Sequence, residues 1–258
     1  MSDTIDIATD LNAESLKRLI RMDIDAIHVR GFYPAELSAR FAAKIAGHSD
    51  LEAYKVQNAL KRLGMGYVDV GKDEQNVGRY HNEAIRSMWG IRDLIYPQIT
   101  PLDHLRLLLE EVWPAGATIE TADNQKCFVG TCRVIDPGAN MLPHNDRFGR
   151  MRLDGLADMT GQLAVNIYLQ MPEAGGEIEL WLKEPTAAQD KEQETRDGLD
   201  RDSLGEPKLV VKPEEGDLVI FNSRLIHGVT AGIGKRQRVT MSCFIGYRDD
   251  ALPLTYWS

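Results

Sequence analysis

From about residue 126 the chain becomes a succession of short apolar stretches, each closed by glycine or proline, and this pattern limits the fold more than any other feature. Turn-forming residues separate the stretches, as in the segments 136–138 and 213–216. Short strands joined by such turns are typical of antiparallel double-sheeted barrels. The sequence therefore predicts a jelly roll, or double-stranded β-helix, over 126–247. Its expected strands are 127–135, 162–170, 177–183, 208–212, 217–222 and 238–246.

The first half of the chain, about 1–125, is expected to be mainly helical and to pack on one sheet of the barrel. Apolar residues recur every four positions in 37–45, and a hydroxyl residue followed by proline marks the start of a helix over 101–112. A third helix is expected over 82–95, with its apolar side chains in the core. In this half only 24–30 alternates as a half-buried strand does. The predicted fold class is α+β.

Length and composition agree with one domain spanning 1–258, because all-β barrels of this size often remain single. The formal net charge of -9 weighs against nucleic acid or an anionic membrane as a partner. No apolar run is long enough to span a bilayer, and the acidic start carries no secretory signal. Cys127, Cys132 and Cys243 are too scattered for a disulfide framework or a zinc site. We therefore expect a cytoplasmic protein with buried, reduced thiols.

The segment 184–207 is crowded with charged and amide side chains and has few large apolar residues. Such a composition is not expected to bury enough surface to join the core. Two interpretations stay open, namely a solvated insertion and a lid over an active site, since long loops in compact domains are often functional.

Three side chains have the types and the order of a metal centre. His144 and Asp146 are two residues apart, so on an extended segment they point to the same side. His227 follows an apolar strand that would deliver it to the same barrel interior. Two imidazoles and one carboxylate occupy one face of an octahedral Fe(II) and leave three positions open. The sequence predicts that these three residues bind iron, whereas the other histidines are expected to be structural: His28, His48, His81 and His104.

Arg238 adds a second feature to this predicted iron centre, because a guanidinium can bind the distal carboxylate of 2-oxoglutarate while the other end of 2-oxoglutarate chelates the same iron. Thr240 shares a strand face with it and is expected to help bind that carboxylate. Hydrolytic zinc sites also use two histidines and a carboxylate, but they usually carry H-E-x-x-H on one helix and have no use for such an arginine. An Fe(II)- and 2-oxoglutarate-dependent oxygenase, with O2 as oxidant, is the leading hypothesis.

Further pocket residues are expected on the strands beside the metal-binding segment. Asn166 and Tyr168 are candidates for contact with 2-oxoglutarate. Arg133, together with Arg147 and Phe148 next to the metal ligands, are candidates for contact with the substrate. The metal and the co-substrate carry the chemistry, so no side chain beyond the iron centre is expected to act as a general base.

With these residues, the sequence resembles the prolyl-4-hydroxylase-like branch of the Fe(II)/2-oxoglutarate oxygenases over about 126–247. A closer likeness is to the carrier-independent halogenases of hapalindole-type alkaloid biosynthesis, and it extends to the early segment 29–34 and to the ending Tyr256-Trp257-Ser258. The likeness to the branch is carried by 137–146, 175–178 and 216–221, with His227 and Arg238. The likeness to the halogenases also rests on 172–177 and 216–222.

One departure from the halogenases bears on the reaction. Those enzymes have glycine where this chain has Asp146, and the missing carboxylate leaves an iron position for chloride. The resemblance with Asp146 present implies hydroxylation of an unactivated C–H bond in a small molecule of the amino acid, alkaloid or nucleotide type. No carrier-protein module is visible. Desaturation, epoxidation and cyclisation by the same chemistry stay open, as does a metal-binding jelly-roll module without turnover.

Overall fold

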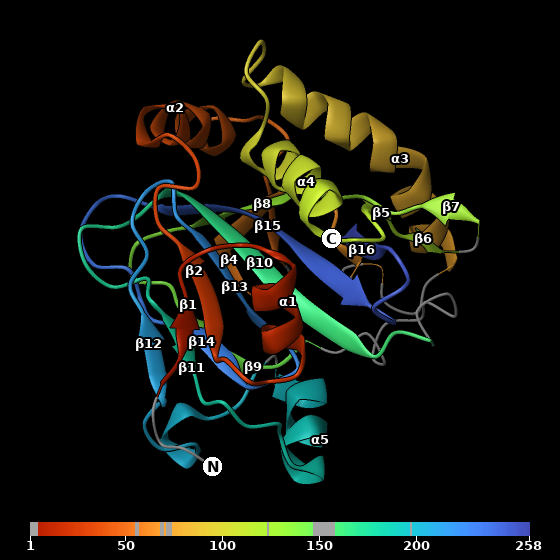
Figure 1. The fold of residues 1–258 in the computed structure, drawn as a ribbon. Coiled ribbons are helices and arrows are strands. Elements are labelled where there is room, and N and C mark those ends of the chain that lie inside the picture. Colours follow the sequence, from red (N-terminus) through yellow and green to blue (C-terminus); the bar gives the residue numbers. More distant parts are fainter. Residues whose placement is uncertain are drawn as a thin grey trace.

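The computed structural model describes residues 5–54, 57–67, 70, 74–122, 124–146, 158–196 and 198–258. Two mainly antiparallel sheets face each other as a jelly roll, and helices α2 (Ala35–Ala46), α3 (Glu74–Asp93) and α4 (Pro101–Val112) cover the outside of the larger sheet (Figure 1). The predicted α+β jelly roll is therefore confirmed. In the described part of the chain no helix is long and apolar enough to cross a membrane.

The larger sheet has its strands in the order β1-β2-β13-β10-β15-β8-β4-β3, with β16 pairing β15 and β5 pairing β16. The smaller sheet has the order β12-β11-β14-β9, and β6 pairs with β7 separately. The strands are β1 (Ile7–Ala8), β2 (Ala26–Val29), β3 (Glu52–Tyr54), β4 (Gln57–Leu63), β5 (Ala117–Ile119), β6 (Thr121–Ala122), β7 (Gln125–Lys126), β8 (Thr131–Ile135), β9 (Met141–His144), β10 (Gly161–Gln170), β11 (Ile178–Leu180), β12 (Leu209–Val211), β13 (Leu218–Asn222), β14 (His227–Val229), β15 (Arg238–Tyr247) and β16 (Leu254–Trp257).

All six strands expected in the second half are present, but the first half is less helical than predicted. The hairpin of β3 and β4 pairs with β8 and extends the larger sheet. Its sequence lacks the apolar alternation that would have marked it. The helices are α1 (Ala13–Ile20), α2 (Ala35–Ala46), α3 (Glu74–Asp93), α4 (Pro101–Val112) and α5 (Ala187–Arg196).

Helix α4 begins as the sequence predicts. The Thr100 side chain accepts a hydrogen bond from the backbone N–H of Asp103, and Pro101 occupies the first turn, where its missing N–H costs nothing. Helix α3 is longer than the expected 82–95, and two of its apolar residues are wrongly placed by the prediction. Ile85 and Trp89 are 44% and 60% exposed, because the buried residue of α3 is in each case the one immediately before them in the sequence.

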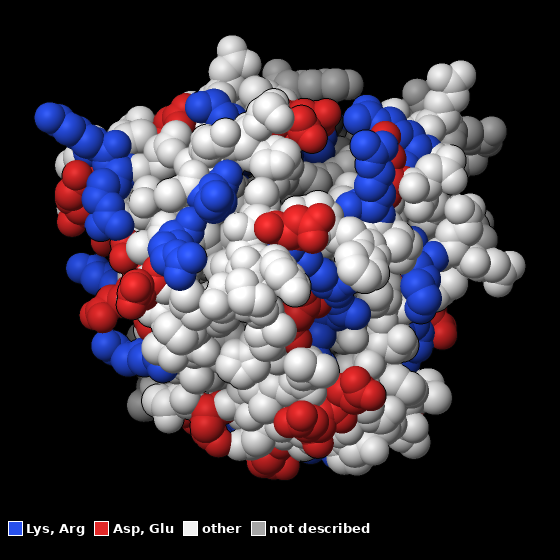
Figure 2. Space-filling model, turned by 90° about the horizontal axis from the view of Figure 1, so that it is seen from above, with Lys and Arg blue, Asp and Glu red and all other residues white. Residues whose placement is uncertain are grey.

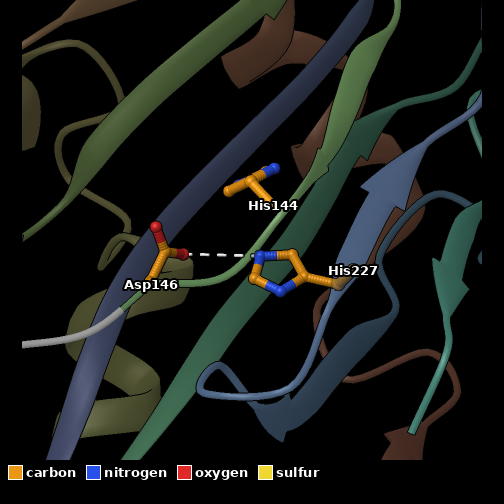
Figure 3. Close-up of side chains that lie close together, drawn as sticks. All are labelled: His144, Asp146 and His227. Atoms are coloured by element: carbon orange, nitrogen blue, oxygen red, sulfur yellow. Dashed lines mark ion pairs between the residues drawn. The ribbon is translucent and has the colours of Figure 1, made fainter. Parts of the chain in front are cut away.

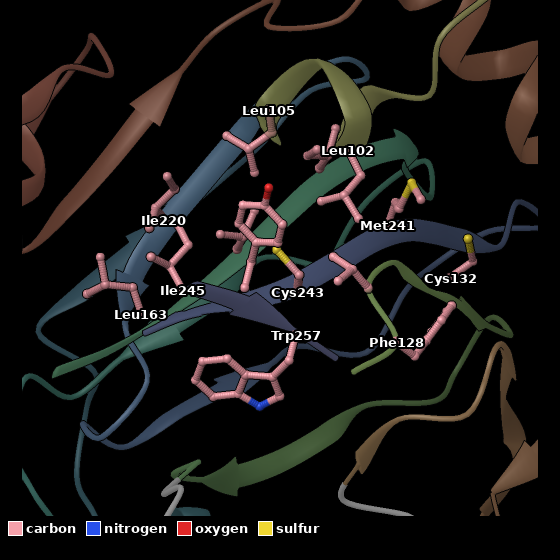
Figure 4. Close-up of a cluster of buried hydrophobic side chains, with 14 of the residues drawn as sticks. Leu102, Leu105, Phe128, Cys132, Leu163, Ile220, Met241, Cys243, Ile245 and Trp257 are labelled. Carbon is pink, nitrogen blue, oxygen red and sulfur yellow. The ribbon is translucent and has the colours of Figure 1, made fainter. Parts of the chain in front are cut away.

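The main core lies between the larger sheet and the helices. Strand β15 alternates across the sheet, so that Met241, Cys243 and Ile245 point to Leu102 and Leu105 of α4 (Figure 4). The three cysteines are buried and free, as expected. The opposite face of β15, which includes Thr240, points into the barrel. A smaller cluster closes the space between the two sheets and consists of Ala26, Ala164, Tyr168, Ile178, Leu180, Leu209, Val211, Val219 and Phe221.

The segment 184–207 contains α5 and a short 3-10 helix, Arg201–Ser203. Contrary to expectation, it buries apolar surface: Leu199 and Leu204 pack with Trp181 and Ile226 in a separate cluster. The prediction failed because two leucines suffice when the other half of the cluster comes from outside the segment.

On the face formed by α2, α3 and α4, acidic and basic side chains are interspersed with uncharged ones (Figure 2). The negative net charge of the chain therefore does not gather on this helical face.

Candidate metal centre

The barrel brings together the three residues predicted to bind a metal. His144 ends β9 and His227 begins β14, and the two residues are directly opposite each other in this antiparallel pair. Asp146 follows two residues after His144. One ligand atom from each residue can be chosen so that all lie within 4.8 Å of one another. Asp146 Oδ2 is 3.4 Å from His227 Nε2, the contact drawn in Figure 3.

Both imidazoles are held in the tautomer that a metal requires. His144 Nδ1 lies 2.7 Å from the carbonyl oxygen of Leu142, and His227 Nδ1 lies 2.9 Å from that of Leu225. A carbonyl oxygen only accepts hydrogen bonds, so Nδ1 carries the proton in each neutral ring. The lone pair is then on Nε2, which is the atom left to coordinate a metal.

The charge states also suit a divalent cation. Burial, reinforced by the neighbouring His227, lowers the pKa of His144 to about 4. Burial would raise the pKa of Asp146, but its contact with His227, in which the ring donates only when it is protonated, and the positive charges of His144 and Arg133 outweigh it and lower that pKa to about 2. At neutral pH the centre therefore contains a neutral His144 and an ionised Asp146, the forms that bind metals.

Arg238 lies inside the barrel at the start of β15 and is only 4% exposed. Its Nε donates to the carbonyl oxygen of Gly176 at 3.2 Å, and its guanidinium lies 5.1 Å from the ring centre of Tyr168. Desolvation lowers its pKa. Among the described residues no Asp or Glu forms an ion pair with Arg238, so this buried cation is suited to an anionic ligand.

Gly176 is required for this arrangement. Its φ is +76°, and a Cβ there would come within 3.3 Å of Arg238 Cδ. The glycine thus allows the backbone to approach the guanidinium closely enough to accept its hydrogen bond.

Tyr168 and Thr240 face each other across β10 and β15, next to Arg238. Burial raises the pKa of Tyr168 to about 12, although the Arg238 charge acts in the opposite direction. Thr240 Oγ1 is buried and makes no hydrogen bond within the described structure. A buried hydroxyl of this kind needs a partner. Together with the Arg238 guanidinium, which has no acidic partner among the described residues, it forms a cradle whose N–H and O–H groups can donate to a carboxylate.

A cavity of about 470 Å³ connects the metal centre with Arg238. Asn166 and Arg133 line it, whereas Tyr168 and Thr240 are not among its lining residues, although both are close to Arg238, which lines it. Arg133 Nε donates to the Tyr54 hydroxyl at 3.3 Å, and its Nη1 donates to Ser242 Oγ. The predicted residues Arg147 and Phe148 lie outside the described residues.

Several cavity residues were missed by the sequence reasoning. Tyr54 comes from the unexpected β3, and Gln193 and Arg196 come from α5. None belongs to an apolar pattern or a metal motif, so no sequence signal marks them. The remaining four histidines make contacts elsewhere: His28 with Asp217, His48 with Asp50, His81 with Lys126 and His104 with Phe32.

A jelly roll that holds two histidines and a carboxylate beside a buried arginine defines the class of Fe(II)/2-oxoglutarate-dependent oxygenases. Within that class, the chain belongs to the family of the carrier-protein-independent halogenase WelO5, whose family model matches residues 4–258.

Two relatives illustrate the range of the similarity. The chain is 28% identical over 202 residues to L-gamma-glutamyl-L-propargylglycine hydroxylase of Streptantibioticus cattleyicolor, which covers 74% of this chain and 72% of the relative. The crystal structure of an N-substituted L-amino acid dioxygenase from Burkholderia ambifaria superimposes with a TM-score of 0.65 at 18% identity, over 95% of this chain and 91% of that one. This second likeness is one of fold.

Proposed function

We propose that this protein hydroxylates an unactivated C–H bond of a small amino-acid-type molecule and consumes 2-oxoglutarate and O2. The observation that carries the proposal is the shared cavity: three residues that could hold a metal, and a buried arginine that has no acidic partner among the described residues, face the same space. A non-catalytic metal site would need only the first of these two features.

His144, Asp146 and His227 would hold Fe(II), the histidines through Nε2. Arg238, supported by Tyr168 and the unpartnered Thr240 hydroxyl, would hold the distal carboxylate of 2-oxoglutarate. When bound, iron and 2-oxoglutarate supply the oxidising power that converts C–H to C–OH with O2, releasing succinate and carbon dioxide. The residues of the chain would orient the reactants in the cavity.

Hydroxylation is favoured over halogenation because Asp146 stands in the ligand set. Its carboxylate would fill the third protein position on the metal, which a halide would otherwise take. The S. cattleyicolor relative is named a hydroxylase, which agrees with this choice.

The substrate class follows from the relatives and from the cavity. One relative is named for a dipeptide-like amino acid derivative, and another for N-substituted L-amino acids. Arg133 brings a guanidinium into the cavity, where Tyr54 and Ser242 orient it. We infer that Arg133 binds a carboxylate of the substrate.

Anaerobic addition of Fe(II) and 2-oxoglutarate tests the core of the proposal. A weak visible charge-transfer band should appear with the wild-type protein and be absent in His227→Ala. Screening acidic amino acid derivatives for substrate-dependent succinate and a product heavier by one oxygen atom then tests the reaction. A protein that binds metal but forms neither the band nor succinate would contradict the proposal.

A further inference from the structure

The side chain of Gln193 joins α5 to the metal-binding segment. Gln193 Oε1 accepts a hydrogen bond from the backbone N–H of Asn145 at 3.0 Å, and Gln193 Nε2 donates to Asn145 Oδ1 at 3.1 Å. Asn145 is the residue between His144 and Asp146, so this reciprocal pair acts on the short link between two of the candidate ligands.

Gln193 meets a need that the barrel strands leave open. The pairing of β9 with β14 ends at His144, and Asn145 is only 3% exposed. Its buried backbone N–H therefore requires an acceptor from outside the sheet, which Gln193 provides.

The other side of the same segment is fixed by the turn between β13 and β14. Asn145 Nδ2 donates to the carbonyl oxygen of Arg224 at 3.0 Å, and the backbone N–H of Asp146 donates to that of Ser223 at 2.8 Å. The link between the ligands is thus clamped between this turn and α5, so its position depends on both.

The residues that follow helix α5 are held by contacts with β9 and by the cluster described above. A ten-residue, strongly polar helix is not stable alone in water. The backbone N–H of Leu199 donates to the carbonyl oxygen of Pro143 at 2.7 Å, and a Cβ on Gly198 would come within 2.5 Å of Leu142 Cβ. The chain leaving α5 therefore lies directly on the strand that carries His144.

We propose that Gln193 is a positioning residue for the metal centre: through Asn145 it fixes His144 and Asp146 relative to each other. Because Gln193 also lines the cavity, the same residue links the wall formed by α5 to the geometry of the ligands. This inference rests on the proposed function only in requiring that the three residues bind a divalent metal.

Co(II) is the probe, because its absorption spectrum reports coordination geometry without turnover. Gln193→Met keeps the length and helical preference of the side chain but removes both hydrogen bonds. We expect it to raise the dissociation constant for Co(II) about 10-fold, in the range found when groups that orient metal ligands are removed, and to alter the Co(II) spectrum. Lys191→Ala, at an exposed position of the same helix, should leave both unchanged.

The possible outcomes distinguish a failure of the positioning role of Gln193 from a failure of the metal site. Gln193→Ala, which also removes the packing, should resemble Gln193→Met, and thermal unfolding of each variant establishes that it is folded. Wild-type affinity and spectrum in Gln193→Met, with Co(II) binding lost in His227→Ala, would overturn the positioning role alone. Co(II) binding that survives His227→Ala would overturn the metal site, and the proposed function with it.

Discussion

His144 and His227 are far apart in the sequence but face each other across a single antiparallel strand pair, with ring centres 4.4 Å apart. Each ring donates from Nδ1 to a backbone carbonyl of its own chain segment, two residues earlier. The smaller sheet thus fixes the spacing of the rings, while the local backbone fixes their tautomers. The metal centre is prepared by the fold before a metal arrives.

Replacement of Asp146 tests the third ligand. Asp146→Gly should reduce hydroxylation by about 100-fold or more, because an open site with only two protein ligands holds iron weakly. Product formation is followed by the gain of one oxygen atom in the mass spectrum, with and without added chloride. Undiminished hydroxylation in this variant would contradict the ligand assignment, and Asp146→Asn separates the loss of charge from the loss of the side chain.

Arg238→Ala should raise the KM for 2-oxoglutarate about 100-fold, equivalent to roughly 2.7 kcal/mol, because a buried charge-assisted contact is lost. The measurement is succinate formation against 2-oxoglutarate concentration. Arg238→Lys is the matched control, since it keeps the charge but loses the planar guanidinium. Its KM for 2-oxoglutarate should lie between those of the wild type and Arg238→Ala. An unchanged KM in the alanine variant would exclude Arg238 from co-substrate binding.

Thr240→Val distinguishes a binding role from a structural one by its effects on the free energy of unfolding and on the KM for 2-oxoglutarate. The hydroxyl is buried and has no hydrogen-bond partner in the described structure, so its removal should leave the free energy of unfolding unchanged or raise it by up to about 1 kcal/mol. The same change should raise the KM for 2-oxoglutarate several-fold. Urea unfolding without ligand and succinate kinetics give the two values; lower stability with an unaltered KM would indicate a purely structural hydroxyl.

Asp103 provides a pH-dependent contribution to stability away from the cavity. Burial opposes its ionisation, but hydrogen bonds from Arg92 and Thr100 and the charge of Arg106 outweigh this and lower its pKa. A carboxyl with a lower pKa in the folded state stabilises above its unfolded pKa, and the contribution is lost as pH falls through the folded value. Asp103→Asn should therefore cost about 1–2 kcal/mol at pH 7 and progressively less at a pH below the unfolded pKa of the carboxyl group.

Urea unfolding of this variant and the wild type at the two pH values checks the expectation. Asp93→Asn, at an exposed position near the end of α3, is the control and should have little effect at either pH. A difference between Asp103→Asn and the wild type that stays constant with pH would show that the carboxylate charge is not responsible.

The barrel strands and the metal-site residues could be predicted because both follow from local patterns. The first six residues of strand β15, Arg238 to Cys243, alternate polar and apolar, and the spacing of His144 and Asp146 places them on one side of an extended segment. The short strands β9 and β14 gave no such pattern: β9 includes Pro143, and three or four residues are too few to show alternation.

Gln193 and Tyr54 could not be predicted from the sequence either, and the reason differs from the one that applies to β9 and β14. An amide on a polar helix has no periodicity to distinguish it from its exposed neighbours. Its importance lies in a contact with Asn145, 48 positions away in the chain, which only the packing of α5 on β9 creates. Trp89 shows the converse error, since an aromatic residue in a helix was expected in the core but lies one position off the buried face.

The buried guanidinium of Arg238 has a consequence for the lifetime of the protein as well as for its chemistry. No carboxylate in the described part of the chain compensates this buried charge, and its desolvation is a cost that the folded state bears and the unfolded chain does not. A dicarboxylic acid that binds there offsets this cost and therefore stabilises the folded state. Resistance to heat and to proteases should then rise with the supply of 2-oxoglutarate, so that a central metabolite would govern how long each molecule survives between turnovers.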